Sequence, residues 1–222
     1  MKEARDTRTN AAARSPAEVY DERFVPAPFK HWGPALCDEA NVRSGQRVLD
    51  VACGTGALKL AAAERVAPGG AVVGLDASPE MLAVARRKSA PIEWRDGRAE
   101  ALPFPGASFD AVVSQFGFMF FEDKPTAFSE LMRVVKPGGR LAVAVCDAVE
   151  NSPGYNAFAL MLDRLFGVEA GRACAWTLGG VLDDDQFERI LEESETALRP
   201  FATDGGAIAF DMPSLFVKAQ KA

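Results

Sequence analysis

The sequence contains a single histidine, His31, among its 222 residues. Histidine-based metal sites and mechanisms that use two histidines need more than one such side chain, so both are excluded. Cysteine is also scarce, and the four cysteines stand at scattered positions without a Cys-x-x-Cys spacing. We interpret them as small buried apolar residues rather than as a disulfide pair or metal ligands, and we expect no bound metal.

Long apolar runs and an excess of positive charge are missing as well. No run approaches the roughly 20 residues of a membrane-spanning helix, and the polar N-terminus lacks the apolar core of a signal peptide. The chain has 25 Lys and Arg against 31 Asp and Glu, a formal net charge of −6. This balance disfavours nucleic acid as a partner, because nucleic-acid binding depends on basic residues that neutralise phosphates. We therefore expect a cytoplasmic protein with a small-molecule partner, no nucleic acid and no membrane span.

A glycine-rich segment at residues 48–56, Val-Leu-Asp-Val-Ala-Cys-Gly-Thr-Gly, is the most informative part of the sequence. Its apolar start and small-residue end predict a strand, a tight loop and then the beginning of a helix. Gly54 and Gly56 allow backbone angles that other residues avoid, and they allow a ligand to approach the main chain closely. Asp76 follows twenty residues after Gly56, at the end of a second apolar run. An acid at that distance accepts hydrogen bonds from ribose hydroxyls, so the pattern predicts an adenosine-containing ligand.

Two common nucleotide-binding patterns do not fit this segment. A dinucleotide fingerprint has Gly or Ala three residues after Gly56, where this chain has Lys59. The Gly-Lys-Ser/Thr of a phosphate-binding P-loop does not occur. An NAD(P)-dependent oxidoreductase is therefore a disfavoured alternative.

The glycine-rich segment resembles motif I of the class I S-adenosylmethionine-dependent methyltransferases. Further matching segments follow in the order of that family, at residues 74–82, 99–104, 108–113 and 130–141. The resemblance covers about residues 17–147 and is to the ubiquinone/menaquinone C-methyltransferase-like branch, methyltransferase domain type 11. It implies a cofactor, S-adenosyl-L-methionine, with S-adenosyl-L-homocysteine as product, and a small-molecule methyl acceptor for a monomer or homodimer. An S-adenosylmethionine-binding protein with little or no catalysis is the alternative.

The resemblance also assigns roles to residues at the ends of the first two predicted strands. Asp50, Ala52, Gly54 and Gly56 belong to the loop that holds the methionine part of the cofactor, where the acid helps to bind the amino group. Asp76 and Ala77 are expected to bind the cofactor at its ribose. Alternatively, Asp76 is a helix N-cap, in competition with Ser78. Met81 is expected to pack on the adenine or, alternatively, in the core.

Other assignments come from later in the chain and from its N-terminal part. Arg98 stands where relatives often have an Asp that accepts from the adenine amino group, and Arg cannot accept. We expect the Ala99 backbone to read the adenine, with Arg98 stacked on it or turned to solvent. Gln115, after the fourth strand, is expected at the methionine end of the cofactor. Three N-terminal aromatic residues resemble the segment that closes over the cofactor in relatives: Tyr20, Phe24 and Phe29.

No arrangement of residues identifies a catalytic base. Methyl transfer is an in-line displacement in which the protein mainly aligns the reactants and excludes water. His31, Glu122 and Asp123 are weak candidates, each of which fits a surface or turn residue better than a base.

The alternation of apolar and helical patterns predicts an α/β fold, a doubly wound and mostly parallel Rossmann-like sheet with a shortened C-terminal part. We divide the chain into a mobile tail at 1–15 and one domain at 16–222. The domain comprises an N-terminal helical cover at 16–46, a cofactor-binding core at 47–147, and a helical cap with C-terminal strands at 148–222. Expected strands are 47–51, 71–75, 92–95, 109–115, 140–147, 207–210 and 215–219. Expected helices are 15–24, 29–42, 57–66, 79–88, 125–135, 153–167 and 183–199. Residues 171–182 lack the segment that usually supplies a further strand, which predicts a reduced wall for the acceptor pocket.

Overall fold

A computed structural model describes residues 14–29, 31–88, 92–167, 184–205 and 213–222 of the chain. For a few of these, including Phe24, Phe187 and Leu191, only the backbone is described. Most of the predicted tail and the predicted strand at 207–210 lie outside the described residues, as does the segment 171–182.

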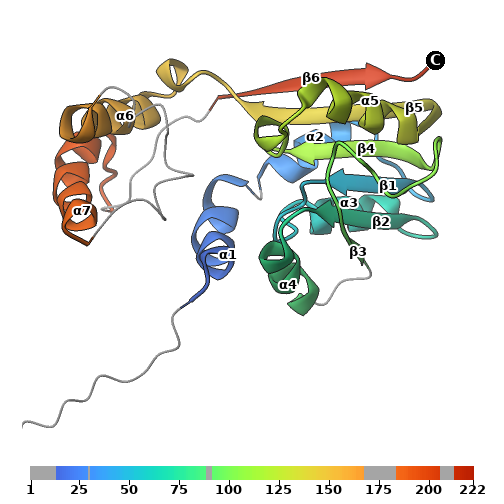
Figure 1. The fold of residues 1–222 in the computed structure, drawn as a ribbon, viewed down its shortest axis with the longest axis horizontal. Helices are drawn as coiled ribbons and strands as arrows, with labels where there is room; N and C mark the ends of the chain where they lie inside the picture. The colour runs from blue at the N-terminus through green and yellow to red at the C-terminus, as the bar shows by residue number, and fades with distance from the viewer. Residues whose placement is uncertain (1–13, 30, 89–91, 168–183, 206–212) are drawn as a thin grey trace, which may run out of the picture.

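Six strands form one sheet in the order β3-β2-β1-β4-β5-β6 (Figure 1). They are β1 Arg47–Val51, β2 Ala71–Asp76, β3 Ile92–Asp96, β4 Phe109–Gln115, β5 Val135–Cys146 and β6 Ser214–Gln220. The first five pair in parallel, and β6 pairs antiparallel with β5. The strand order changes direction between β1 and β4, which is where an open parallel sheet binds its ligands. The predicted mostly parallel α/β sheet is confirmed.

Helices cover both faces of the sheet because successive strand residues point to opposite sides. On one face, Val48 and Ala111 pack with helices α2 Trp32–Glu39 and α3 Lys59–Val66. On the other, Leu49 and Val112 pack with helix α5 Lys124–Val134. Helix α4 Pro79–Arg87 packs along β2 and β3. The near-continuous burial of β1, β2 and β4 is that of parallel strands buried on both faces.

The N-terminal helix begins as predicted but does not end as predicted. Ser15 caps helix α1 Pro16–Val19 and forms a capping box with Glu18, with Pro16 in the first turn. The predicted stop before Pro26 is wrong, because a π-helix, η1 Tyr20–Phe29, continues through this region. Proline ends an α-helix because its ring clashes with the carbonyl four residues back. A π-helix pairs residues five apart instead of four, so the rule for α-helices does not apply directly. The next helix, α2, is correspondingly shorter than the predicted 29–42.

The C-terminal part forms a separate pair of helices and the last strand. Helices α6 Pro153–Phe166 and α7 Asp184–Leu198 pack on each other around Met161, Leu162 and Ile190. The pair lies to one side of the sheet, beyond the ends of the strands (Figure 1). Within the described ranges no parallel strand follows β5, so β6 forms that edge of the sheet. The described residues also include the short 3-10 helices η2 Phe118–Phe120, η3 Val149–Asn151 and η5 Arg199–Phe201. No helix among the described residues has both the length and the apolar character needed to cross a membrane.

Candidate active site

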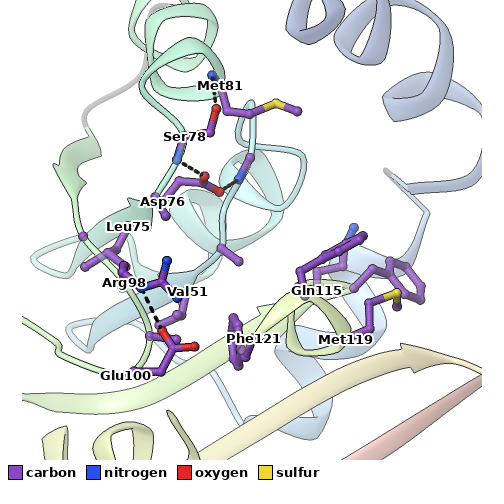
Figure 2. A pocket seen from close by; sticks show the side chains of 18 of the residues that line it. Val51, Leu75, Asp76, Ser78, Met81, Arg98, Glu100, Gln115, Met119 and Phe121 are labelled. Carbon is purple, nitrogen blue, oxygen red and sulfur yellow. Dashed lines mark hydrogen bonds and ion pairs between the residues drawn. The ribbon is translucent and has the colours of Figure 1, made fainter. Parts of the chain in front are cut away.

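A pocket of about 400 Å³ lies at the carboxyl ends of β1, β2 and β4. Its walls come from the glycine loop after β1, the turn after β2, the turn after β3, the segment after β4 and the N-terminal helices. Figure 2 shows Asp76, Met81 and Arg98 on one side of this space and Gln115 and Met119 on the other. Most of the site residues predicted from distant parts of the sequence therefore meet around one cavity.

Asp76 connects the glycine loop to the start of α4. Its Oδ2 accepts a hydrogen bond from the backbone N–H of Gly54 at 2.7 Å, and its Oδ1 accepts one from Ser78 N–H at 2.8 Å (Figure 2). Ser78 itself is the N-cap of α4, because its Oγ accepts from Met81 N–H at 3.3 Å. Burial raises the pKa of Asp76, while the backbone N–H groups of Ser78 and Gly54 oppose that rise. Since Ser78 fills the cap, the Asp76 carboxylate remains at the wall of the pocket.

The two glycines of the loop have different surroundings. Gly54, at φ +54°, lines the pocket, and the Tyr20 ring would lie 3.8 Å from a Cβ placed there. Gly56, at φ +84°, is buried away from the pocket, and a Cβ there would lie 2.7 Å from Cη2 of Trp94. Gly56 thus makes room for Trp94, which no sequence motif had indicated. The only signal was a large aromatic residue in the middle of the third strand.

Two residues other than glycine also have left-handed backbone angles at the pocket wall. They are Ala52, at φ +57° after β1, and Phe116, at φ +56° after β4. Gly117 directly follows Phe116, and a Cβ placed on it would lie 2.4 Å from the Cβ of Ala52. Strained backbone of this kind concentrates at functional sites. The ends of β1 and β4 therefore approach closely at the floor of the pocket.

Asp50 is buried below the glycine loop and does not reach the pocket wall. Burial, together with the nearby Asp76 carboxylate, raises the pKa of Asp50 to about 8. Its Oδ1 has no hydrogen-bond partner among the described residues, and the same holds for Oε1 of Gln115. Gln115 is fixed by its other end, because Nε2 donates to the backbone oxygen of Phe29 at 2.8 Å. Two buried acceptor atoms thus lack a hydrogen-bond partner among the described residues.

Arg98 is paired with acids at the edge of the pocket. Its Nη2 lies 2.9 Å from a Glu122 carboxylate oxygen, and its Nε lies 3.5 Å from Glu100. Glu100 also accepts from the backbone N–H groups of Glu122 and Asp123. The Arg98 side chain is half exposed and lines the pocket beside the buried Ala99. Neither acid was predicted as a partner of Arg98, since only the fold brings the turns after β3 and β4 together.

Aromatic residues form the wall opposite Asp76. Tyr20 stacks on Phe29 with ring centroids 5.7 Å apart, and Phe29 contacts Phe116 at 5.3 Å. Burial, followed by the charges of Asp76 and Asp50, raises the pKa of Tyr20 far above its ordinary value, so its hydroxyl stays protonated. The predicted role of Phe24 concerns a side chain outside the described residues. Other lining residues are Ala77, Met81, Met119, Phe120 and Phe121.

Each weak candidate for a catalytic base is exposed to solvent or engaged in a structural contact. His31 is exposed at the start of α2. Asp123 is the N-cap of α5, because it accepts from Thr126 N–H at 3.0 Å. Glu122 lines the pocket but is paired with Arg98. No cluster of three or more potential metal ligands occurs in the described part of the chain.

The strand order, the glycine loop and the acid at the end of the neighbouring strand define a Rossmann-like α/β protein. Residues 49–143 match the family described as Methyltransferase domain. The chain belongs to the S-adenosylmethionine-dependent methyltransferases of this family. The predicted family and enzyme class are confirmed.

Individual relatives agree with this assignment. The demethylmenaquinone methyltransferase of Deinococcus radiodurans is 45% identical over 196 residues, covering 84% of this chain and 80% of that protein. The protein of the same name from Listeria monocytogenes is 30% identical over 228 residues, covering 94% and 96%. That of Thermus thermophilus is 47% identical over 116 residues, and there the match spans only about half of each chain, 50% and 52%.

Solved structures show the same fold. The YcgJ protein of Bacillus subtilis has a TM-score of 0.56 at 24% identity, covering 86% of this chain and 98% of that one. A SAM-dependent methyltransferase from Aquifex aeolicus has a TM-score of 0.54 at 20% identity, covering 82% and 88%. These neighbours show the fold, and the family implies the use of S-adenosylmethionine.

Proposed function

We propose that this chain transfers a methyl group from S-adenosylmethionine to a carbon atom of a small aromatic acceptor of the quinol type. The observation that carries the proposal is the division of one pocket into two halves. One half is formed by the glycine loop and Asp76, and the other by aromatic and methionine side chains after β4 and in the N-terminal helices. The relatives named as demethylmenaquinone methyltransferases support an acceptor of this chemical class.

The polar half has the groups that the cofactor requires. Asp76 has lone pairs beyond the two that accept from the backbone, so it can also accept from ribose hydroxyls. Asp50 and Gln115 each have a buried acceptor atom without a partner among the described residues, and we place the ammonium group of the methionine part near them. Where the polar half meets the aromatic half, the faces of Tyr20 and Phe29 suit a sulfonium cation. These groups fit S-adenosylmethionine better than a dinucleotide, because two buried carboxyl groups do not suit the negatively charged pyrophosphate of a dinucleotide.

The protein contributes alignment and exclusion of water. Bound S-adenosylmethionine supplies an electrophilic methyl group. Phe116, Met119 and Phe121 present apolar surface that keeps water from the aromatic half of the pocket. Gln115, fixed to the Phe29 carbonyl, holds the N-terminal segment against the end of β4. Orientation of this kind accounts for up to roughly 7–11 kcal/mol of a barrier in favourable cases.

Two experiments test the proposal in sequence. A thermal melt with S-adenosylhomocysteine should show stabilisation of roughly 2.7 kcal/mol at a hundredfold excess over Kd, with NAD as the control that leaves the melt unchanged. A methyl-transfer assay should then show product with a short-chain demethylmenaquinol and less with catechols or simple amines. An unchanged melt would refute the cofactor assignment. Binding of S-adenosylhomocysteine without preference for the quinol would refute the acceptor class alone.

A further inference from the structure

A buried polar cluster joins the N-terminal helices to the glycine loop. Oγ1 of Thr55 donates to Oδ1 of Asp21 at 2.6 Å. The ammonium of Lys88 donates to the same carboxylate oxygen and, at 2.8 Å, to the backbone oxygen of Thr55. Thr55 is fully buried, and the side chains of Asp21 and Lys88 are only 20% and 24% exposed. We call these three residues the clamp.

The clamp connects three parts of the chain that are remote in sequence. Asp21 lies in the π-helix η1, Thr55 in the glycine loop, and Lys88 at the C-terminal end of α4. An ammonium group has three donors, and two of them are used here to tie the loop carbonyl and the Asp21 carboxylate together. Because both contacts are charge-assisted and largely screened from water, they are stronger than an exposed pair.

The position of the clamp relates it to the pocket. Tyr20, next to Asp21, has its ring over Gly54, which lines the pocket one residue before Thr55. At the other end of η1, the carbonyl of Phe29 is held by Gln115. Residues 15–29, which we call the cover, are therefore attached at both ends of η1 to segments that line the pocket.

We propose that Lys88 is a positioning residue that, through Asp21 and Thr55, holds the cover closed on the glycine loop and so slows release of the nucleoside ligand. The identity of that ligand rests on the proposed function, whereas the clamp itself does not. Lys88 lines no part of the pocket and acts through the other two residues.

The chain supplies a matched control at the neighbouring position. Arg87 also forms an ion pair with the cover, to Glu18, but its side chain is 65% exposed. Exposed ion pairs contribute little to stability. Lys88→Met and Arg87→Met each remove one cation that contacts the cover from the same end of α4. The two original side chains differ in that Lys88 is largely buried and Arg87 is exposed.

The first experiment uses the protein without ligand. Hydrogen exchange of backbone amides in residues 16–29 and 53–57 should be about tenfold faster in Lys88→Met, in keeping with the loss of a charge-assisted hydrogen bond. Arg87→Met should match the unsubstituted chain within about twofold. Exchange in Lys88→Met no faster than in Arg87→Met would overturn the proposal. This arm requires no ligand, so it is decisive even if S-adenosylhomocysteine does not bind.

The second experiment measures ligand release. Lys88→Met should increase the dissociation rate of S-adenosylhomocysteine about tenfold, while Arg87→Met leaves it unchanged. In an Asp21→Asn background, Lys88→Met should add less than about twofold, because the two residues act as a unit. Unchanged release in Lys88→Met, or additive effects of the two substitutions, would refute the clamp. If Lys88→Met fails to fold, Lys88→Gln and Asp21→Asn keep polar side chains and provide the same comparisons.

Discussion

The carboxylate of Asp76 accepts a hydrogen bond from the backbone N–H of Gly54 at 2.7 Å, so the acid at the end of β2 fixes the glycine loop after β1. The ribose-binding role predicted for Asp76 and the loop geometry predicted around Gly54 are therefore physically linked. A change at Asp76 affects both the shape of the loop and the groups that it offers to a ligand.

Replacing Asp76 tests this double role. Asp76→Ala removes the acceptor for Gly54 and Ser78 as well as any bond to ribose hydroxyls. Loss of a charged hydrogen bond costs on the order of 1.5–3 kcal/mol, so affinity for S-adenosylhomocysteine should fall about ten- to a hundredfold by isothermal titration. Asp76→Asn keeps one acceptor oxygen, so its affinity should lie between that of the unsubstituted chain and that of Asp76→Ala. Affinity within twofold of the unsubstituted chain would restrict Asp76 to the loop.

We expect Asp50 to make both stability and ligand affinity depend on pH. Its pKa of about 8, raised by burial and then by Asp76, means that the folded protein keeps a proton there that the unfolded chain releases near its ordinary pKa of about 3.9. The contribution of this group to stability is therefore complete below that ordinary pKa and is lost as the pH rises toward 8.

A cationic amino group bound near Asp50 favours the ionised carboxylate. Affinity for S-adenosylhomocysteine should thus increase by up to about tenfold per pH unit between about pH 6 and pH 8, with proton release on binding. Titration calorimetry in buffers of different ionisation enthalpy measures both quantities. Asp50→Asn should flatten the profile, and a flat profile in the unsubstituted chain would count against the role of Asp50.

The close approach of β1 and β4 predicts that Gly117 tolerates no side chain. A Cβ at Gly117 would lie 2.4 Å from that of Ala52 and 2.9 Å from Oγ of Ser114. Gly117→Ala should destabilise the protein by about 1–3 kcal/mol, the usual cost of overpacking, and weaken ligand binding. In Gly106→Ala the nearest atom is at an ordinary 3.5 Å, so that variant should unfold at the same denaturant concentration as the unsubstituted chain, or slightly above it. Equal stabilities of the two variants would contradict the predicted clash.

The acceptor half of the pocket predicts a separation of kinetic effects. Phe120 lines the pocket and is 60% exposed, whereas Phe128, on α5, is 39% exposed and lines no part of it. Phe120→Ala should raise the KM for a quinol acceptor about three- to tenfold, in the range of one aromatic contact, with no change in affinity for S-adenosylhomocysteine. Phe128→Ala should change neither value. If Phe120→Ala changed only the affinity for the cofactor, Phe120 would belong to the cofactor half of the pocket and the prediction would be wrong.

The N-terminal segment shows why part of the fold was not predictable. Ser15, Pro16 and Glu18 identified the start of the helix correctly, because capping is a local interaction. The end was predicted wrongly because the rule for Pro26 assumes α-helical geometry, while burial of Phe29 and its bond to Gln115 accompany a π-helix. Those contacts join residues 86 positions apart, so no local pattern reports them.

The sequence by itself determined the mostly parallel α/β fold and predicted a nucleoside site at residues 50–76, because apolar periodicity and glycine spacing are local properties of the chain. Only the tertiary structure decided that Gly54 faces the pocket while Gly56 makes room for Trp94, and that Arg98 pairs with Glu122. The same holds for the clamp, in which Lys88 meets Asp21 across 67 positions. Such pairings depend on how helices and loops pack at one edge of the sheet, and that packing follows from the whole chain rather than from any one segment.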